Sequence, residues 1–286
     1  MRIQGKSCTL TVAKDGYYYP LPYSEETVRQ TSKGYALPGV IGERNREKTI
    51  ITGTAIQGCF VTRLEYQNVL ALFLLLFYYE EVFDLFADRI CEQLIYKNLT
   101  VKSFELRGEN GKALYLRIDV KDTSDSFIDS WPLNMPDLSW GPSTGSGTAG
   151  IGTGTADNNT TTVDNSSTTP RTYYYDGHYV VADLQTLPLV YRFELGGNYT
   201  EKSKYEITLY FPLDTVFFPT LNKIEKLTIL LDQKDGISLD LYELEPVGSM
   251  TDINCADTVL CFQKFIIESQ IILNIRNQNE NKTVVL

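Results

Sequence analysis

The chain has 286 residues and a formal net charge of −10, and 43% of its residues are hydrophobic. This apolar content can fill the core of one large or two modest domains, which excludes a wholly disordered chain, and the 19 tyrosines and 13 phenylalanines favour β-strands. The acidic balance argues against a protein that grips nucleic acid, because such binding depends on lysine and arginine side chains that neutralise phosphates.

The sequence gives no sign of secretion or membrane insertion. Its first residues lack the apolar run of a signal peptide, and the longest apolar run, residues 69–79, has only about half the length that a membrane helix needs. The five cysteines form no Cys-x-x-Cys pair. We therefore expect no membrane segment and no zinc ribbon, but free thiols in a reducing cytoplasm.

The first part of the chain predicts short strands around one long loop. Residues 7–12 are a predicted strand, and the tyrosine-rich residues 17–23 are a predicted edge segment, because their two prolines cannot donate to a sheet. Further strands are expected at residues 27–31 and, as two short strands, at residues 49–64. Residues 32–48 are rich in glycine and charge, and they predict a long loop of the kind that usually carries function.

One long amphipathic helix is predicted for about residues 66–97. Apolar residues recur there in steps of three and four, which is typical of a helix with one buried face, and acidic residues occupy the other face. We expect this helix to pack on the sheets through a stripe that includes Leu72, Leu76, Phe83, Phe86 and Ile90.

A β-hairpin is predicted directly after the helix. Residues 99–107 and 112–120 flank an Asn-Gly dipeptide, which is a strong signal for a tight hairpin turn. In the second strand Leu114, Leu116 and Ile118 alternate with polar residues. One face of this strand should therefore pack on a core, and the other should face water or a partner.

The middle of the chain interrupts this pattern. Residues 124–172 begin with a segment rich in proline and tryptophan and continue with glycine, serine, threonine and asparagine. Such a stretch cannot bury enough apolar surface to offset its ordering entropy, so it predicts a mobile surface insertion. The predicted organisation is a β-unit with helix and loop at 1–123, this insertion at 124–172, and a second β-rich unit at 173–286.

The second half predicts strands and no further clear amphipathic helix. Its strand-like runs lie at residues 189–195, 204–211, 224–231, 237–243 and 259–274. The predicted fold class is therefore mainly β (α+β), a β-sandwich or barrel with one long helix packed on its sheets.

A short motif occurs in both halves. Phe-Glu-Leu at residues 104–106 and again at 193–195 is followed by a glycine turn, an alternating strand and Asp-Thr. One interpretation is a pair of related β-units that flank the insertion. The other is that two hairpins built from β-formers are alike by chance.

The chain lacks the residue patterns of common enzymes. Its single histidine, His178, lies beside a turn signal, and no nucleophile motif, phosphate loop or metal motif accompanies it. The carboxylates at positions 80, 81, 84 and 88 are better explained as a solvated helix face than as a metal cluster, because no histidine joins them. We expect no catalytic residue, no cofactor and no metal.

The N-terminal half resembles the bacteriophage tail-tube family. The resemblance covers mainly residues 5–122 and rests on the order of elements, on Gly-Thr-Ala-Ile-Gln-Gly at residues 53–58, and on the run of residues 104–120 after the helix. The chain departs from the family pattern in its length and in the insertion at residues 141–172.

The resemblance implies a structural virion protein whose copies form rings, commonly six-fold, that stack into a tail tube. Viral DNA would pass through the lumen without specific binding, and other tail proteins would be partners. Assembly would take place in the bacterial host cytoplasm. Residues 32–48 would be the stacking loop, and the residues meeting acidic side chains of the next ring would be Lys33, Arg44, Arg46 and Lys48.

Two other classes of protein share these features. One is a different virion component, such as a distal tail, connector or capsid-surface protein. The other is a cellular β-sandwich module that recognises carbohydrate through its many tyrosines. A third alternative, an enzyme of unfamiliar type, is the least favoured because the chain has a single histidine. Assembly of the purified protein into rings or hollow rods separates a tube subunit from a binding module, which should stay monomeric.

Overall fold

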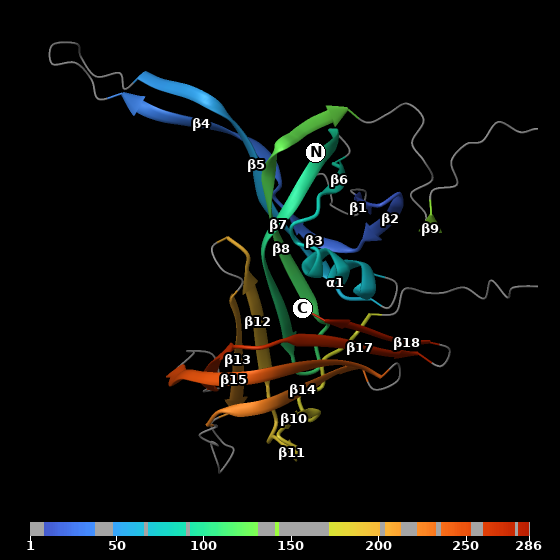
Figure 1. Cartoon of the computed structure of the whole chain (residues 1–286), viewed down its shortest axis with the longest axis vertical. Coiled ribbons are helices and arrows are strands. Elements are labelled where there is room, and N and C mark those ends of the chain that lie inside the picture. The colour runs from blue at the N-terminus through green and yellow to red at the C-terminus, as the bar shows by residue number, and fades with distance from the viewer. Residues whose placement is uncertain are drawn as a thin grey trace, which may run out of the picture.

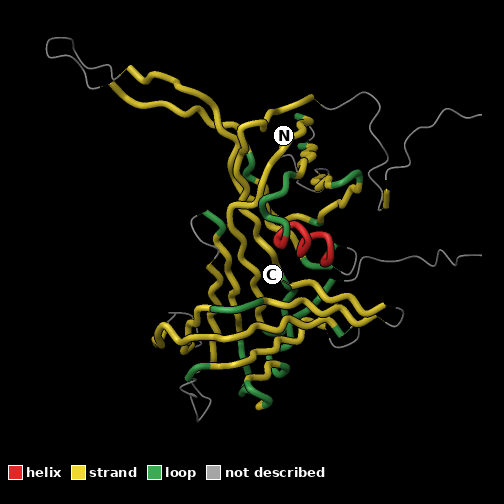
Figure 2. Tube along the Cα trace, viewed as in Figure 1, coloured by secondary structure: helices red, strands yellow, loops and turns green. Residues whose placement is uncertain are grey.

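The computed structural model is mainly β, as the sequence predicts. It describes residues 9–37, 48–65, 68–89, 92–130, 141–142, 172–200, 204–212, 222–232, 236–252, 260–277 and 280–285. Antiparallel strands dominate the described residues, together with one short helix near the middle of the molecule (Figure 2). Their pairing leaves the sheet open, so the described strands form no closed barrel.

Eighteen strands and one helix are assigned within the described residues. Those of the N-terminal half are β1 (Thr9–Lys14), β2 (Tyr17–Leu21), β3 (Tyr23–Glu26), β4 (Arg29–Leu37), β5 (Lys48–Arg63), α1 (Val69–Phe77), β6 (Phe83–Asp88), β7 (Gln93–Glu109), β8 (Tyr115–Ser130) and β9 (Gly141–Pro142). Those of the C-terminal half are β10 (Val180–Ala182), β11 (Gln185–Thr186), β12 (Arg192–Asn198), β13 (Lys204–Pro212), β14 (Ile224–Asp232), β15 (Ile237–Asp252), β16 (Leu260–Ile267), β17 (Ile271–Asn277) and β18 (Glu280–Val285).

A central sheet runs through both halves of the chain. Its strands pair in the spatial order β3–β5–β8–β7–β12–β13–β16–β15, and every pairing is antiparallel. The pairing of β7 with β12 joins the N-terminal strands to the C-terminal strands. Strand β8 also continues past residue 123, the position at which the sequence suggested the first unit would end.

A second layer of strands crosses this central sheet (Figure 1). Strand β15 belongs to both layers, since residues 237–241 pair with β17 and residues 244–252 pair with β16. The bend between the two parts lies at Glu243, which adopts a positive φ of 55°. Buried residues of both layers form one continuous core, as expected when a sheet turns a corner and packs on itself.

The long helix predicted for residues 66–97 is wrong. Helix α1 covers only Val69–Phe77, the chain turns after it, and β6 follows at Phe83–Asp88. Leu72 and Leu76 are buried in α1, as predicted, whereas the buried Phe83 lies on a strand. Among the described residues, no helix is long and apolar enough to cross a membrane.

The apolar spacing led to the wrong helix prediction because β6 is buried on both faces. The strand lies between β1 and β7, and its Phe83 and Leu85 join the main core. Phe86 packs on the opposite face against Tyr18, with ring centroids 5.7 Å apart. A strand with apolar residues on both faces after a buried helix reproduces steps of three and four. Ile90 lies outside the described residues.

Strands β4 and β5 form a ribbon that projects from the body of the molecule (Figure 1). The loop predicted at residues 32–48 is therefore partly strand, because Lys33 pairs with Gly53 and Leu37 with Lys48. Residues 38–47 lie outside the described part of the chain. The two short strands expected at residues 49–64 are one long strand, β5.

Gly58 marks the place where β5 leaves the ribbon and enters the central sheet. It has a φ of +150°, and an added Cβ would lie 2.6 Å from the Cα of Val28. Only glycine fits this conformation and this close approach of the backbone.

Candidate functional site

The outward face of the central sheet carries many polar side chains. Along β7 and β8, residues such as Leu106 and Leu116 point into the core, and the residues between them point outward. The same alternation continues along β12 and β13. This polar surface, which we call the outer face, follows from the period-2 geometry of strands.

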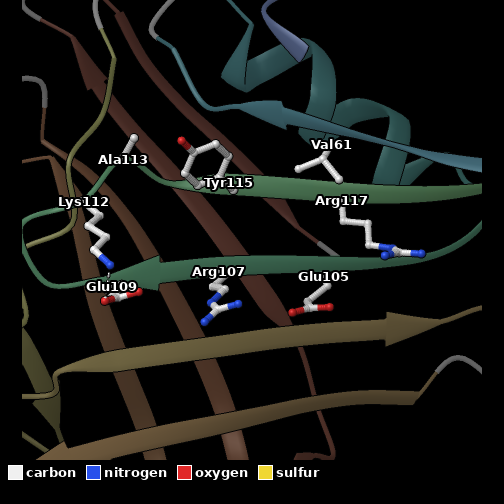
Figure 3. Close-up of a pocket in the computed structure, with 8 residues that line it drawn as sticks. All are labelled: Val61, Glu105, Arg107, Glu109, Lys112, Ala113, Tyr115 and Arg117. Carbon is white, nitrogen blue, oxygen red and sulfur yellow. Dashed lines mark ion pairs between the residues drawn. The ribbon is translucent and has the colours of Figure 1, made fainter. Parts of the chain in front are cut away.

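A hollow of about 460 Å³ lies on the outer face over β5, β7 and β8 (Figure 3). Cross-strand neighbours form its floor, since Glu105 lies opposite Arg117 and Arg107 lies opposite Tyr115. Glu105, Arg107 and Glu109 come from β7, and Tyr115 and Arg117 from β8. The residues that line the hollow are Val61, Glu105, Arg107, Glu109, Lys112, Ala113, Tyr115 and Arg117.

A neighbouring hollow of about 450 Å³ lies where β7 meets β12 and β13. Gly196 pairs with Glu105 on one side and with Glu206 on the other, so no side chain fills the space between these two carboxylates. Asn198, Lys204 and Lys264 also line this hollow.

Most charges of the outer face are paired within it. Arg117 lies 3.1 Å from Asp119, Arg107 lies 3.7 Å from Glu194, and Lys264 lies 2.5 Å from Glu206. Each exposed pair contributes only about 0–1 kcal/mol to stability. Their larger consequence is that the face has little excess charge of either sign.

Glu109 is the best-connected carboxylate at the rim of the first hollow. It lies 2.6 Å from the Lys112 ammonium group and accepts a hydrogen bond of 3.1 Å from the Tyr191 hydroxyl. Partial burial raises the pKa of Glu109, but these hydrogen bonds outweigh it, so the pKa lies below its usual value. The same hydrogen bond raises the pKa of Tyr191.

The described residues offer little to reactive chemistry. No group of three His, Cys, Asp or Glu side chains within the described ranges could hold a metal ion. His178 is exposed at a turn, where its backbone N–H donates to the Asp176 carboxylate at 3.1 Å. Cys59 and Cys261 are buried, and neither forms a disulfide bond within the described part of the chain.

The two described residues that were predicted to contact the next ring do not lie on the outer face. Lys33 and Lys48 lie on the ribbon, in β4 and β5 respectively. Arg44 and Arg46 lie outside the described residues.

The sequence indicated the outer face only in part. The alternation of residues 114–120 predicted one polar face for that strand. It carried no signal for the pairing of β7 with β12, which extends the face across both halves.

Neither a comparison with models of known protein families nor a comparison with curated proteins finds a match to this chain.

Proposed function

We propose that this protein is a structural virion subunit, a bacteriophage tail-tube protein whose copies form rings that stack into a DNA-conducting tube. In this proposal the protein acts through self-assembly, without catalysis and without a cofactor. The observation that carries the proposal is the projecting β4–β5 ribbon.

The ribbon has the properties of an assembly element. Among the described strands, β4 pairs only with β5, and residues 48–56 of β5 pair only with β4. Within the described part of the chain, both outer edges therefore leave backbone donors and acceptors open to another strand. An isolated two-stranded ribbon is marginally stable in water, so a partner surface would stabilise it.

Charge favours a second copy as that partner. Residues 29–57 contain five basic and two acidic residues, a net charge of +3 in a chain of −10, so the remainder carries −13. Opposite charges on ribbon and body would attract one copy to the next and fix the register of contact. Lys33 and Lys48 are the described basic residues closest to the distal end of the ribbon.

The ends of the central sheet are less open to strand addition than the ribbon. The β3–β5 pairing has a bulge between Tyr23 and Glu25, and the β15–β16 pairing has one between Pro246 and Gly248. Bulges, proline and acidic residues at a sheet edge oppose pairing with another chain. The proposal therefore assigns the main assembly contact to the ribbon.

The outer face suits a surface that meets DNA without holding it. Its arginines and lysines are largely engaged with carboxylates of the same face. Counterion release by free basic side chains, which supplies non-specific DNA affinity, would be small there.

Deletion of residues 36–46 tests the role of the ribbon. The shortened protein should keep the circular dichroism spectrum and urea midpoint of the full chain but fail to form stacked rings or rods in negative stain. The matched control is Leu184→Gln, because Leu184 is 97% exposed at a turn remote from the ribbon in sequence and should leave assembly unchanged. Normal polymers from the deletion variant would show that the ribbon is not the stacking element.

The charges of the ribbon can be tested separately. Lys33→Glu with Lys48→Glu should weaken association between copies, and this loss should mimic the effect of high salt on the unaltered protein. Lys223→Glu changes an exposed lysine on the C-terminal half and serves as the charge control. If the unaltered protein stayed monomeric at every concentration, a binding module would be the better explanation. A screen for glycan binding would then test that alternative.

A further inference from the structure

The seam between β7 and β12 pairs two strands that carry the same motif. Phe104-Glu105-Leu106 on β7 and Phe193-Glu194-Leu195 on β12 run antiparallel, and Leu106 pairs directly with Leu195. Each leucine thus faces its own counterpart in the other copy of the motif. This arrangement defines a local two-fold axis that passes between the two leucines.

The packing at the seam obeys that axis. Phe104 lies over Gly197, and Phe193 lies over Gly108, so the phenylalanine of each motif covers the glycine of the other. A Cβ added at either glycine would overlap the facing ring. Both rings are buried, at 4% and 0% exposure. Aromatic rings that cover cross-strand glycines compensate for the missing glycine side chains.

The strands on either side extend the same symmetry. The register of the pairings equates β8 with β13, so that Leu116 corresponds to Ile207 and Ile118 to Leu209, all four of them buried. Matching the Asp-Thr dipeptides of the two hairpins in the sequence aligns Ala113 with Tyr205, an offset one residue larger than the strand register gives.

The outermost strands give independent support. The same registers equate β5 with β16 and β3 with β15. The bulge in β3 leaves Ser24 without a paired residue in the register with β5, and the bulge in β15 leaves Val247 without one in the register with β16. Thr62 and Phe265, which flank the two bulges, are equivalent positions under the two-fold relation. Two hairpins that were alike only by chance would not be expected to carry a bulge at the same position, so the matched bulges support a relation between the units.

We infer that the β7–β12 seam is a self-association interface folded into one chain: two related four-stranded units pair with each other as two copies of one subunit would. The edge of β7 fits a second copy of the unit to which β7 belongs. In this chain the related unit that contains β12 takes that place. The hairpins occur in a different order along the chain in the two units, so the equivalence rests on register and packing. This inference is independent of the proposed tail-tube function.

The symmetry is incomplete at one position on the outer face. Arg107 faces Glu194 across the seam and lies 3.7 Å from it. The two-fold counterpart of this pair would join an arginine at position 196 to Glu105, but position 196 is glycine. An added Cβ there would have only the Phe104 carbonyl oxygen within 4 Å, at 3.6 Å, so the site has room for a side chain.

The test is a set of substitutions at Gly196 in the full chain. Urea midpoints should rank Gly196→Arg above Gly196→Gln, and Gly196→Gln above Gly196→Glu. Arginine should change the unfolding constant by about two- to fivefold relative to glutamine, as expected for a cross-strand ion pair. Gly196 also pairs with Glu206, so the control is Glu206→Gln. The arginine advantage should fall more when Glu105→Gln is added than when Glu206→Gln is added. Arginine no better than glutamine, or an advantage that depends on Glu206 and not on Glu105, would overturn the inference.

The glycine–phenylalanine pairs provide a second readout. Gly197→Ala should lower the urea midpoint, and Phe104→Leu should restore part of the loss, whereas Phe193→Leu should not. Gly108→Ala should show the mirror-image pattern, with partial restoration by Phe193→Leu alone. Two results would contradict a two-fold interface. One is restoration of the Gly197→Ala variant by Phe193→Leu, or of the Gly108→Ala variant by Phe104→Leu. The other is a lower urea midpoint for only one of the two glycine variants.

Discussion

The β4–β5 ribbon and the β7–β12 seam are both antiparallel strand pairs, but their surroundings differ. The seam lies inside the central sheet, and its Leu106 and Leu195 are 0% and 1% exposed. On the ribbon, Gln30, Ser32 and Thr54 are exposed, and no described strand covers either outer edge. The comparison teaches that burial stabilises the seam within one chain, whereas the described outer edges of the ribbon are open to the strand pairing that the proposed assembly requires.

The largest expected effect separates the two regions by stability. Leu106→Ala should destabilise the protein by about 2–5 kcal/mol, because it opens a cavity at the centre of the seam. Thr54→Ala on the ribbon should change stability by less than about 0.5 kcal/mol. Urea unfolding measures both. Equal losses at the two sites would mean that the ribbon is part of the folded core.

The next effect concerns the base of the ribbon. Arg89 makes a two-pronged ion pair with Glu26, at 2.8 and 2.9 Å, and donates to the Val28 carbonyl at 2.6 Å, which the Tyr96 hydroxyl also contacts. Glu26 is nearly buried, so Arg89→Ala leaves its charge without its partner. Because Arg89 is partly exposed, the loss of stability should be smaller than the about 3–5 kcal/mol typical of a fully buried ion pair.

Hydrogen exchange locates the consequence of that change. Arg89→Ala should increase exchange selectively in residues 27–37, which follow the clamped segment. Arg89→Lys keeps the charge but loses the two-pronged geometry, so it should give an intermediate result. An increase in exchange that is the same in all parts of the chain would show that Arg89 stabilises the whole core instead of the ribbon.

A smaller effect is expected at the bend of β5. Gly58→Ala introduces a Cβ that meets backbone atoms of Thr27 and Val28, and it should destabilise by about 1–3 kcal/mol. Gly53→Ala, on the ribbon itself, is the matched control because an added Cβ there has no atom within 4 Å. Urea midpoints that are the same for both variants would show that the bend can relax.

The smallest effect is a pH dependence at the outer face. The pKa of Glu109 is lower in the folded chain than in the unfolded chain, so its interactions stabilise the fold above the unfolded pKa of about 4. This contribution is lost as the pH falls through the folded pKa. Glu109→Gln should therefore lose less stability than the unaltered protein between pH 7 and pH 3. Equal losses of stability in the two proteins over this pH range would show that Glu109 does not cause the pH dependence.

The sequence predicted the strands well and the helix poorly. Alternation and the Asn-Gly turn located β7 and β8, since one buried face gives a clear period of two. The same reasoning failed at Phe83 and Phe86, because a strand buried on both faces has no such period. Long-range features were invisible for a different reason. The pairing of β7 with β12 and the two matched bulges depend on contacts between distant segments, which no local pattern encodes.

The state of association of the intact purified chain tests the central claim most directly. Negative-stain microscopy together with sedimentation velocity, over a range of protein concentration, should show rings or hollow rods built from many copies. A single sedimenting species with the mass of one 32.4 kDa chain, and fields of separate particles without rings or rods at any concentration, would contradict a protein that works by self-assembly.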